Sequence, residues 1–183
     1  MCAYNNTQLN MKTFTDNEQE SLIACPKQVI DPPRREMRVD GKMKRNDMTL
    51  KSSDGKHSFR VFMRQSEDFP ENFSIGLMYL PGEEPGSFQL VRCNGQHGGE
   101  RVHPHHAVFH IHRSKADDIN AGFLEPRHIE QAADYASFRE ALAKFCTLVN
   151  VERADDYFPG INQGLLSYGS GESGTERNLS PEL

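Results

Sequence analysis

Apolar and polar side chains alternate in several short segments, and this is the main structural signal of the chain. Between residues 58 and 64 the alternation has period two, which is typical of a strand with one buried face. The segments 73–80 and 88–93 flank a loop rich in Pro and Gly, so we expect an antiparallel hairpin. Further strands are predicted near 47–51 and over 107–113.

A helical pattern begins after Pro126, where apolar residues recur about every 3.6 positions. Ser137 is followed three residues later by Glu140, a signature of a helix N-terminus, so the main helix is predicted over 137–149. The residues from 129 to 136 are expected to form a separate short helix. A further short helix is predicted to begin within 16–24, where acids precede an apolar pair.

Strands followed by a helix predict an α+β fold, with a single antiparallel sheet and the C-terminal helix packed on one face. We expect that face to carry the apolar sides of two strands, namely Phe59, Val61, Ala107, Phe109 and Ile111. Residues 1–20 are expected to be a poorly ordered polar segment and 21–158 to form the domain. Residues 159–183, rich in Gly, Ser, Glu and Asn, are expected to form a flexible tail.

Composition narrows the class of protein. The 183 residues are 36% apolar, which suits one domain with a modest core. No apolar run approaches the ~18 residues that span a bilayer, and the polar N-terminus lacks a signal-peptide layout. The four cysteines are far apart in sequence, unlike a disulfide framework. These features favour a cytoplasmic protein without a membrane partner.

Charge is unevenly distributed along the chain. The formal net charge is −5, but residues 26–65 contain eleven Lys or Arg and five acids. Such a basic subregion can bind phosphate, although a solvated surface of mixed charge is the alternative. Arg60 and Arg64 fall on the same side of their predicted strand and are candidate substrate-binding residues.

Histidine is concentrated in one segment, because six of the eight histidines lie between His97 and His112. Alternation along the predicted strand places His106, His110 and His112 on one face. Imidazoles on a common face can act as an acid and a base, since their ordinary pKa is about 6.5. His110 and His112 could instead supply two ligands for a divalent metal, or could have no active role.

Arg92 ends the strand that precedes the histidines, and Asn94 follows it in an Asn-Gly turn. Guanidinium binds phosphate through two hydrogen bonds, so Arg92 is a candidate for stabilising phosphoryl oxygens, unless it pairs with a nearby acid. Strand alternation predicts that Arg92 shares a face with Phe88 and Leu90.

Three pieces of this region together resemble a known family. The segments Arg92-Cys-Asn-Gly-Gln-His97, Pro104-His-His106 and Phe109-His-Ile-His112 resemble the central block of the TumE-type toxins of bacterial toxin–antitoxin modules. The Asp-Asn pair of that pattern appears here as Asn94-Gly95. The resemblance implies toxicity directed at RNA, with an antitoxin or another protein as partner.

The favoured hypothesis is metal-independent cleavage of RNA, which carries its own nucleophile in the 2′-hydroxyl and needs no cofactor. The predicted catalytic residues are His97, His110, His112 and Arg92. The predicted substrate-binding residues are Asn94, His106, Arg113, Lys115, Arg60 and Arg64, and the basic pair Arg113 and Lys115 favours phosphate over a metal cation. The alternative is a metal- or partner-binding module, or a defence-system subunit, without catalytic activity.

Overall fold

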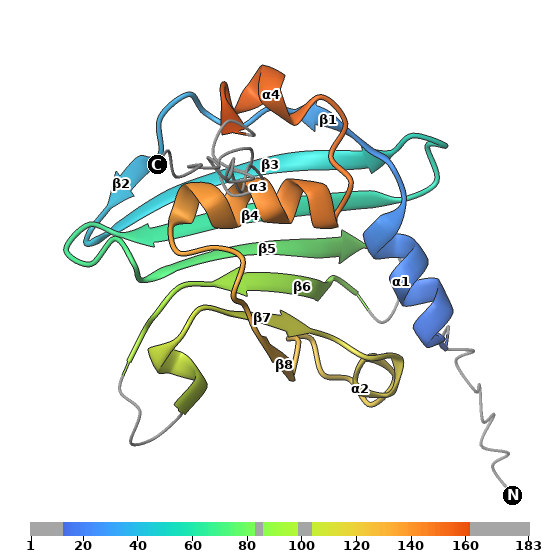
Figure 1. The fold of residues 1–183 in the computed structure, drawn as a ribbon. Helices are drawn as coiled ribbons and strands as arrows, with labels where there is room; N and C mark the ends of the chain where they lie inside the picture. Colours follow the sequence, from blue (N-terminus) through green and yellow to red (C-terminus); the bar gives the residue numbers. More distant parts are fainter. Residues whose placement is uncertain (1–12, 83–85, 99–103, 162–183) are drawn as a thin grey trace, which may run out of the picture.

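The chain folds into one curved antiparallel sheet with helices around it (Figure 1). The computed structural model describes residues 13–82, 86–98 and 104–161. The strand order is β1-β3-β4-β5-β6-β7-β8, and β2 also pairs with β3. The strands are β1 (Lys27–Asp31), β2 (Arg38–Asp40), β3 (Met43–Ser52), β4 (Ser58–Ser66), β5 (Phe73–Leu80), β6 (Phe88–Asn94), β7 (His110–Arg113) and β8 (His128–Gln131).

The helices confirm the predicted α+β class, because the C-terminal helix α3 packs across one face of the sheet (Figure 1). The α-helices are α1 (Asp16–Ala24), α2 (Ala116–Asn120), α3 (Phe138–Leu148) and α4 (Ala154–Tyr157), and the 3₁₀ helix is η1 (Pro104–Ala107). The predictions for residues 1–12 and 162–183 lie outside the described residues. No helix in the described part of the chain is long and apolar enough to cross a membrane.

Local sequence signals correctly predicted the central strands β4, β5 and β6 and the start of helix α3. The hairpin predicted at 73–80 and 88–93 is β5 and β6, and the strand predicted at 58–64 lies within β4. Helix α3 begins where it was predicted, because the Ser137 side chain accepts a hydrogen bond from the Glu140 backbone N–H at 3.2 Å. Such caps satisfy an N–H group that has no partner inside the helix.

Two predicted elements were wrong. Residues 107–109 do not belong to a strand, because the chain forms the 3₁₀ turn η1 from Pro104 and extends only at His110. The segment after Pro126 does not begin with a helix, since residues 128–131 form β8 and pair with β7. The outer edge of β7 needs hydrogen-bond partners, and this requirement prevails over a weak helical pattern.

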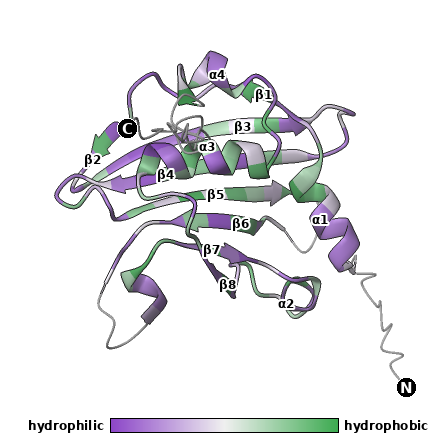
Figure 2. Ribbon diagram, in the orientation of Figure 1, coloured by the Kyte–Doolittle hydropathy of each residue, from purple (hydrophilic) through white to green (hydrophobic). Residues whose placement is uncertain are grey.

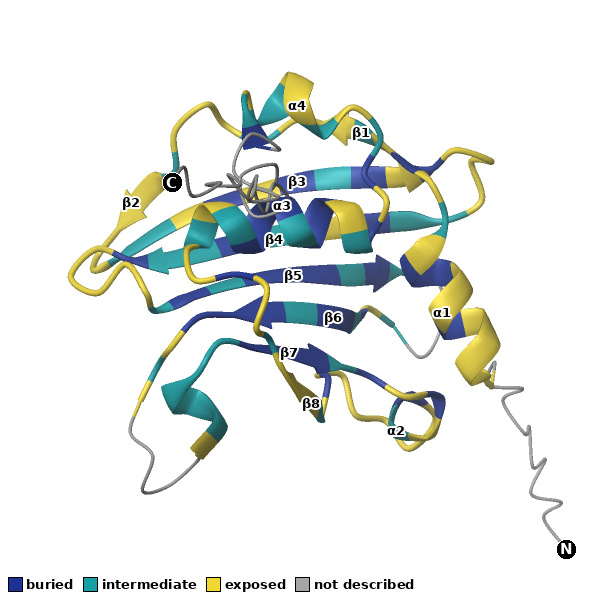
Figure 3. Ribbon diagram, viewed as in Figure 1, coloured by how far each residue is buried: buried dark blue, intermediate teal, exposed yellow. Residues whose placement is uncertain are grey.

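The core lies between α3 and the sheet. Strands β5 and β6 are mostly buried, whereas β8 at the sheet edge is mostly exposed (Figure 3). Helix α3 carries hydrophobic and hydrophilic residues, and it buries Leu142 and Phe145 (Figure 2). Phe59 and Val61 have no exposed surface, as predicted. Full burial of one such side chain contributes about 1.5–3 kcal/mol relative to leaving it exposed.

The remaining residues of the predicted core face behave differently from one another. Ile111 is buried and Phe109 is half-buried, with its ring centroid 6.1 Å from that of Phe73. Ala107 was wrongly placed, because it lies in η1 and lines a surface groove instead of the core.

A bulge in β6 decides which face carries Arg92. Pairing with β5 changes from Leu77↔Val91 to Met78↔Gln89, so β6 holds one extra residue at position 90. Phe88 and Val91 therefore face the core, while Arg92 lies on the opposite face. The expectation that Arg92 shares a face with Phe88 was wrong, because a bulge reverses the alternation.

Candidate functional site

The sheet face opposite α3 brings several of the predicted site residues together. Cross-strand pairing joins Phe62 to Gly76, Gly76 to Arg92, and Arg92 to His112. These residues form one row from β4 to β7. Neighbouring strands lie about 4.8 Å apart, so the row runs across the sheet over about 14 Å.

A second row runs parallel to the first. Arg64 pairs with Ser74, Ser74 with Asn94, and Asn94 with His110. The structure thus places Arg64, Arg92, Asn94 and both strand histidines on the same face, although they come from three strands. Residues directly opposite on one face contact each other through their side chains.

Five imidazoles gather at the β7 end of these rows. The ring centroid of His110 lies 4.9 Å from His112, 5.2 Å from His97 and 5.2 Å from His105. The His106 ring lies 4.3 Å from His97 and 4.3 Å from His105. His105 was not among the predicted site residues, because alternation was applied only to the strand predicted over 107–113 and to the adjoining His106. Pro104 was the available signal for a turn.

His110 and His112 are buried and are held by the backbone. His110 has no exposed surface and His112 is 7% exposed. The Nδ1 atom of His110 lies 2.8 Å from the Val108 carbonyl oxygen, and that of His112 lies 3.2 Å from the Pro126 carbonyl oxygen. A carbonyl only accepts, so each Nδ1 carries the proton and each Nε2 carries the lone pair.

The two Nε2 atoms have different surroundings. His110 Nε2 lies 3.2 Å from the Asn94 side-chain Nδ2, which donates to it. The Asn94 side chain is oriented by Ser74, whose hydroxyl donates to Asn94 Oδ1 at 2.9 Å. His112 Nε2 is buried and has no hydrogen-bond partner among the described residues. A buried polar atom without a partner costs about 1–3 kcal/mol.

Burial also sets the charge of these rings. Desolvation is the largest cause that lowers the pKa of His110 to about 4, and neighbouring imidazoles add to it. Desolvation likewise lowers the pKa of His112 to about 4, with the Arg92 guanidinium as the next cause. Both rings are therefore neutral at pH 7. Neutral imidazoles with protonated Nδ1 can accept at Nε2, which does not favour the general-acid role predicted for one of them.

Arg92 is the only basic side chain that β6 contributes to this face. It is half-buried, and desolvation lowers its pKa while Glu125 partly offsets that effect. Its Nε is buried without a hydrogen-bond partner in the described part of the chain. A guanidinium that keeps an unused donor can still bind an oxyanion.

His97 gives the cluster access from the surface. Its Nδ1 lies 2.9 Å from the Gly95 carbonyl oxygen, so its lone pair is also on Nε2. His97 lines an open groove of about 560 Å³ together with Phe69, Glu71, Asn72, Gln96, Gly98 and Ala107.

Arg113 and Lys115 do not join the histidines, although both were predicted to bind substrate. Alternation along β7 places Arg113 on the core side, where it lies 3.4 Å from Glu130 and 3.9 Å from Glu20. Both basic residues line a separate pocket of about 240 Å³ that also contains these acids.

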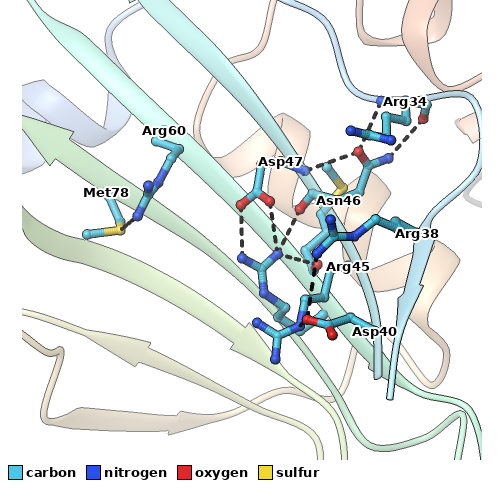
Figure 4. Close-up of polar contacts among 10 residues, drawn as sticks. Arg34, Arg38, Asp40, Arg45, Asn46, Asp47, Arg60 and Met78 are labelled. Atoms are coloured by element: carbon cyan, nitrogen blue, oxygen red, sulfur yellow. Dashed lines mark hydrogen bonds and ion pairs between the residues drawn. The ribbon is translucent and has the colours of Figure 1, made fainter. Parts of the chain in front are cut away.

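Arg60 and Arg64 lie on the same sheet face as the histidines, as strand alternation requires. Arg64 is engaged by Asp47, with nitrogen–oxygen distances of 3.0 and 3.4 Å. Arg60 is exposed, and its guanidinium lies 3.2 Å from the Met78 sulfur, apart from the Asp47 group (Figure 4). Within the described residues Arg60 makes no ion pair, so it remains available to an external anion.

Phe62 lies between these two arginines on β4. A Cβ atom at Gly76 would come within 2.4 Å of the Phe62 ring, so the ring lies directly over the glycine. The Arg64 guanidinium carbon lies 5.6 Å from the ring centroid, within range of a cation–π contact. Gly76 therefore allows an aromatic ring to lie against this face of the sheet.

The imidazole cluster also has the composition of a metal site. His105, His110 and His112 each offer one ring nitrogen, and these nitrogens all lie within 4.8 Å of one another.

Comparisons with protein-family models, curated proteins and solved structures find no match to this chain. The resemblance to the TumE-type toxins therefore remains a prediction, and the interpretation of the site depends on its geometry and chemistry.

Proposed function

We propose that the protein binds single-stranded RNA across the sheet face opposite α3. In this arrangement Arg60 and Arg92 contact phosphates, and Phe62 stacks on a base. The observation that carries the proposal is the row of Phe62, Gly76, Arg92 and His112, which links an aromatic ring to a guanidinium and the imidazoles.

The residue types on this face suit a single strand. Non-specific binding of single-stranded nucleic acid combines a basic surface with aromatic side chains on which bases stack. Phe62 supplies the ring, and the two arginines beside it on β4 supply positive charge. Stacking of one base on an aromatic side chain contributes about 1–3 kcal/mol.

The charge of this face differs from that of the whole chain. Although the formal net charge is −5, strands β1 to β6 present to this face six basic residues and three acids. The basic residues are Arg38, Arg45, Lys51, Arg60, Arg64 and Arg92, and the acids are Asp31, Asp40 and Asp47. A local excess of this kind attracts phosphate and makes affinity fall as salt rises.

His97 supports a preference for RNA over DNA. It is half-buried beside the groove, and its Nδ1–H donates to the Gly95 carbonyl. Its Nε2 carries the lone pair and can accept a hydrogen bond from a 2′-hydroxyl, the group that distinguishes RNA from DNA. An RNA target would place the protein in the cytoplasm, in agreement with the toxin resemblance.

The test is binding of a short fluorescent single-stranded RNA, measured by anisotropy at two salt concentrations. Phe62→Leu should weaken binding by about 5- to 150-fold, equivalent to the loss of one stacked base. Arg60→Gln should weaken binding and reduce the dependence of affinity on salt. The matched control is Lys56→Gln, which removes an exposed charge in a turn where Lys56 pairs with Asp54.

The proposal would be abandoned if the control weakened binding as much as Arg60→Gln. It would also be abandoned if Phe62→Leu left RNA affinity unchanged. Equal affinity for RNA and for DNA of the same sequence would remove the role given to His97.

Cleavage without a metal is a separate prediction of the sequence, tested with RNA in the presence of EDTA. If His110 and His112 formed the acid–base pair, one ring would have to be charged while the other is neutral. Since both pKa values lie at about 4, the bell-shaped activity should be centred near that pH. A maximum near neutral pH would exclude this pair.

A further inference from the structure

We infer that His105, His110 and His112 bind one divalent transition-metal ion. Their ring nitrogens come from η1 and β7 and lie within 4.8 Å of one another. The inference is independent of RNA binding, because it depends only on the arrangement of the imidazoles.

The two strand histidines are already oriented as metal ligands. Each donates its Nδ1–H to a backbone carbonyl, His110 to Val108 and His112 to Pro126. Histidine ligands of metal ions almost always donate their other ring N–H in this way, which fixes the tautomer and the ring orientation. Their Nε2 lone pairs are therefore available for an ion.

The unpartnered Nε2 of His112 is the strongest observation for a ligand. The side chain is 7% exposed, and this atom has no hydrogen-bond partner within the described residues. Native proteins rarely leave such an atom unsatisfied, and those that remain call for a bound water, an ion or a catalytic role. A metal ion bound at this nitrogen supplies the missing partner.

Small movements complete the coordination. Zinc lies about 2.0–2.1 Å from imidazole nitrogen, so two ligands of a tetrahedral ion are ~3.4 Å apart. The triad must close slightly, and His105 can do so because it is half-buried on a four-residue 3₁₀ turn. His110 exchanges the hydrogen bond from Asn94 for the metal bond.

The ligand types select the ion. Three imidazoles suit zinc, copper or nickel, whereas magnesium and calcium require oxygen ligands. Three protein ligands leave the fourth position of a tetrahedral ion for water or an external ligand. Arg92 pairs with His112 across the two strands and keeps an unused Nε donor, so an anionic group is the external ligand of choice.

The experiment titrates Zn²⁺ into tag-free protein that has been stripped of metal with EDTA and then freed of EDTA, and calorimetry measures the binding. The visible spectrum of the Co²⁺ form reports the coordination of the ion. We expect one saturable Zn²⁺ site and no Mg²⁺ binding. His112→Ala and His105→Ala should each weaken Zn²⁺ by more than the ~10- to 100-fold that loss of an outer hydrogen-bond partner costs. Of these two variants, His105→Ala is expected to disturb the fold less, because His105 is half-buried whereas His112 is buried.

His128→Gln is the matched control, because His128 is paired with Asp118 at 2.8 Å and lies outside the triad. It should bind Zn²⁺ as the unmodified protein does. The inference is overturned if Zn²⁺ does not saturate at one ion per chain, or if folded His105→Ala binds as tightly as the unmodified protein. If His105→Ala lost Zn²⁺ binding but kept its RNA affinity, the metal site would be supported and shown to be independent of RNA binding.

Discussion

Two buried polar centres in this protein differ in how completely they are hydrogen-bonded. Lys27 has no exposed surface, and its ammonium donates to three carbonyl oxygens: Ile23 at 2.7 Å, Cys25 at 2.8 Å and Val149 at 2.9 Å. These carbonyls lie at the C-terminal ends of α1 and α3. A cation there matches the negative end of each helix and satisfies carbonyls that have no partner in the helix.

His110 and His112 are buried to a similar degree, but the polar groups around them are incompletely hydrogen-bonded. Arg92 Nε and His112 Nε2 are both without hydrogen-bond partners among the described residues. Lys27 and the histidine site therefore show two different roles of buried polar groups. The fully bonded Lys27 joins two helices and stabilises the fold, whereas unused donors and acceptors on neighbouring strands indicate a place for a ligand.

The largest effect on stability is expected at Lys27. Lys27→Met keeps an unbranched apolar stem but removes the ammonium and leaves three carbonyls, two of them in buried hydrogen bonds, without their donor, which should lower the free energy of unfolding by about 3 kcal/mol or more. Urea denaturation measures this change. The control Lys51→Met, at an exposed position of β3, should stay within about 0.5 kcal/mol. Equal losses in both variants would show that Lys27 does not join the helices as described.

The next effect is the pH dependence of stability in EDTA-treated protein. His110 and His112 titrate near pH 6.5 when unfolded and near pH 4 when folded, because burial disfavours the charged ring. The unfolded state binds more protons between these values, so stability is complete above pH ~6.5 and falls as the pH drops toward 4.

The size of this effect has an upper limit. Since one pKa unit corresponds to 1.36 kcal/mol, each imidazole contributes at most about 3 kcal/mol. Urea denaturation at several pH values should show a smaller decline in the double variant His110→Leu, His112→Leu. An unchanged decline would mean that other groups cause it.

A smaller effect is expected at Gly76. Gly76→Ala places a methyl group within 2.4 Å of the Phe62 ring, so the ring must move. Overpacking of this kind costs typically about 1–3 kcal/mol, and RNA affinity should fall with it if Phe62 stacks on a base. Gly55→Ala is a control for the loss of glycine, because a Cβ there meets only Lys51 at 4.0 Å, although its φ of +77° adds strain. RNA affinity that falls equally in both variants would contradict the role of Phe62.

The smallest effect on stability is expected at His112, despite its burial. His112→Leu removes the hydrogen bond to Pro126 but also removes the unpartnered Nε2, so the two changes oppose each other. The free energy of unfolding at pH 7 should change by no more than about 1 kcal/mol. A loss as large as that of Lys27→Met would mean that His112 is a structural residue, and the comparison between the two centres would fail.

The sequence by itself determined the elements whose signals are local. Alternation over 58–64 and 73–80 predicts strands because side chains of an extended backbone point to opposite faces. Ser137 and Glu140 locate the start of α3 because a cap is a contact between near neighbours. The same local rule correctly places His110 and His112 on one face, since they are two residues apart.

Only the tertiary structure decided which of these residues meet distant partners. The bulge beside Arg92 arises from pairing between β5 and β6, and it moves the guanidinium to the histidine face. Lys27 lies in a basic stretch of sequence, yet it is buried through a contact with Val149, 122 residues away. His105 joins the strand histidines because η1 turns the chain back toward them. Alternation describes one element at a time, whereas burial and charge are set by whichever elements pack against it.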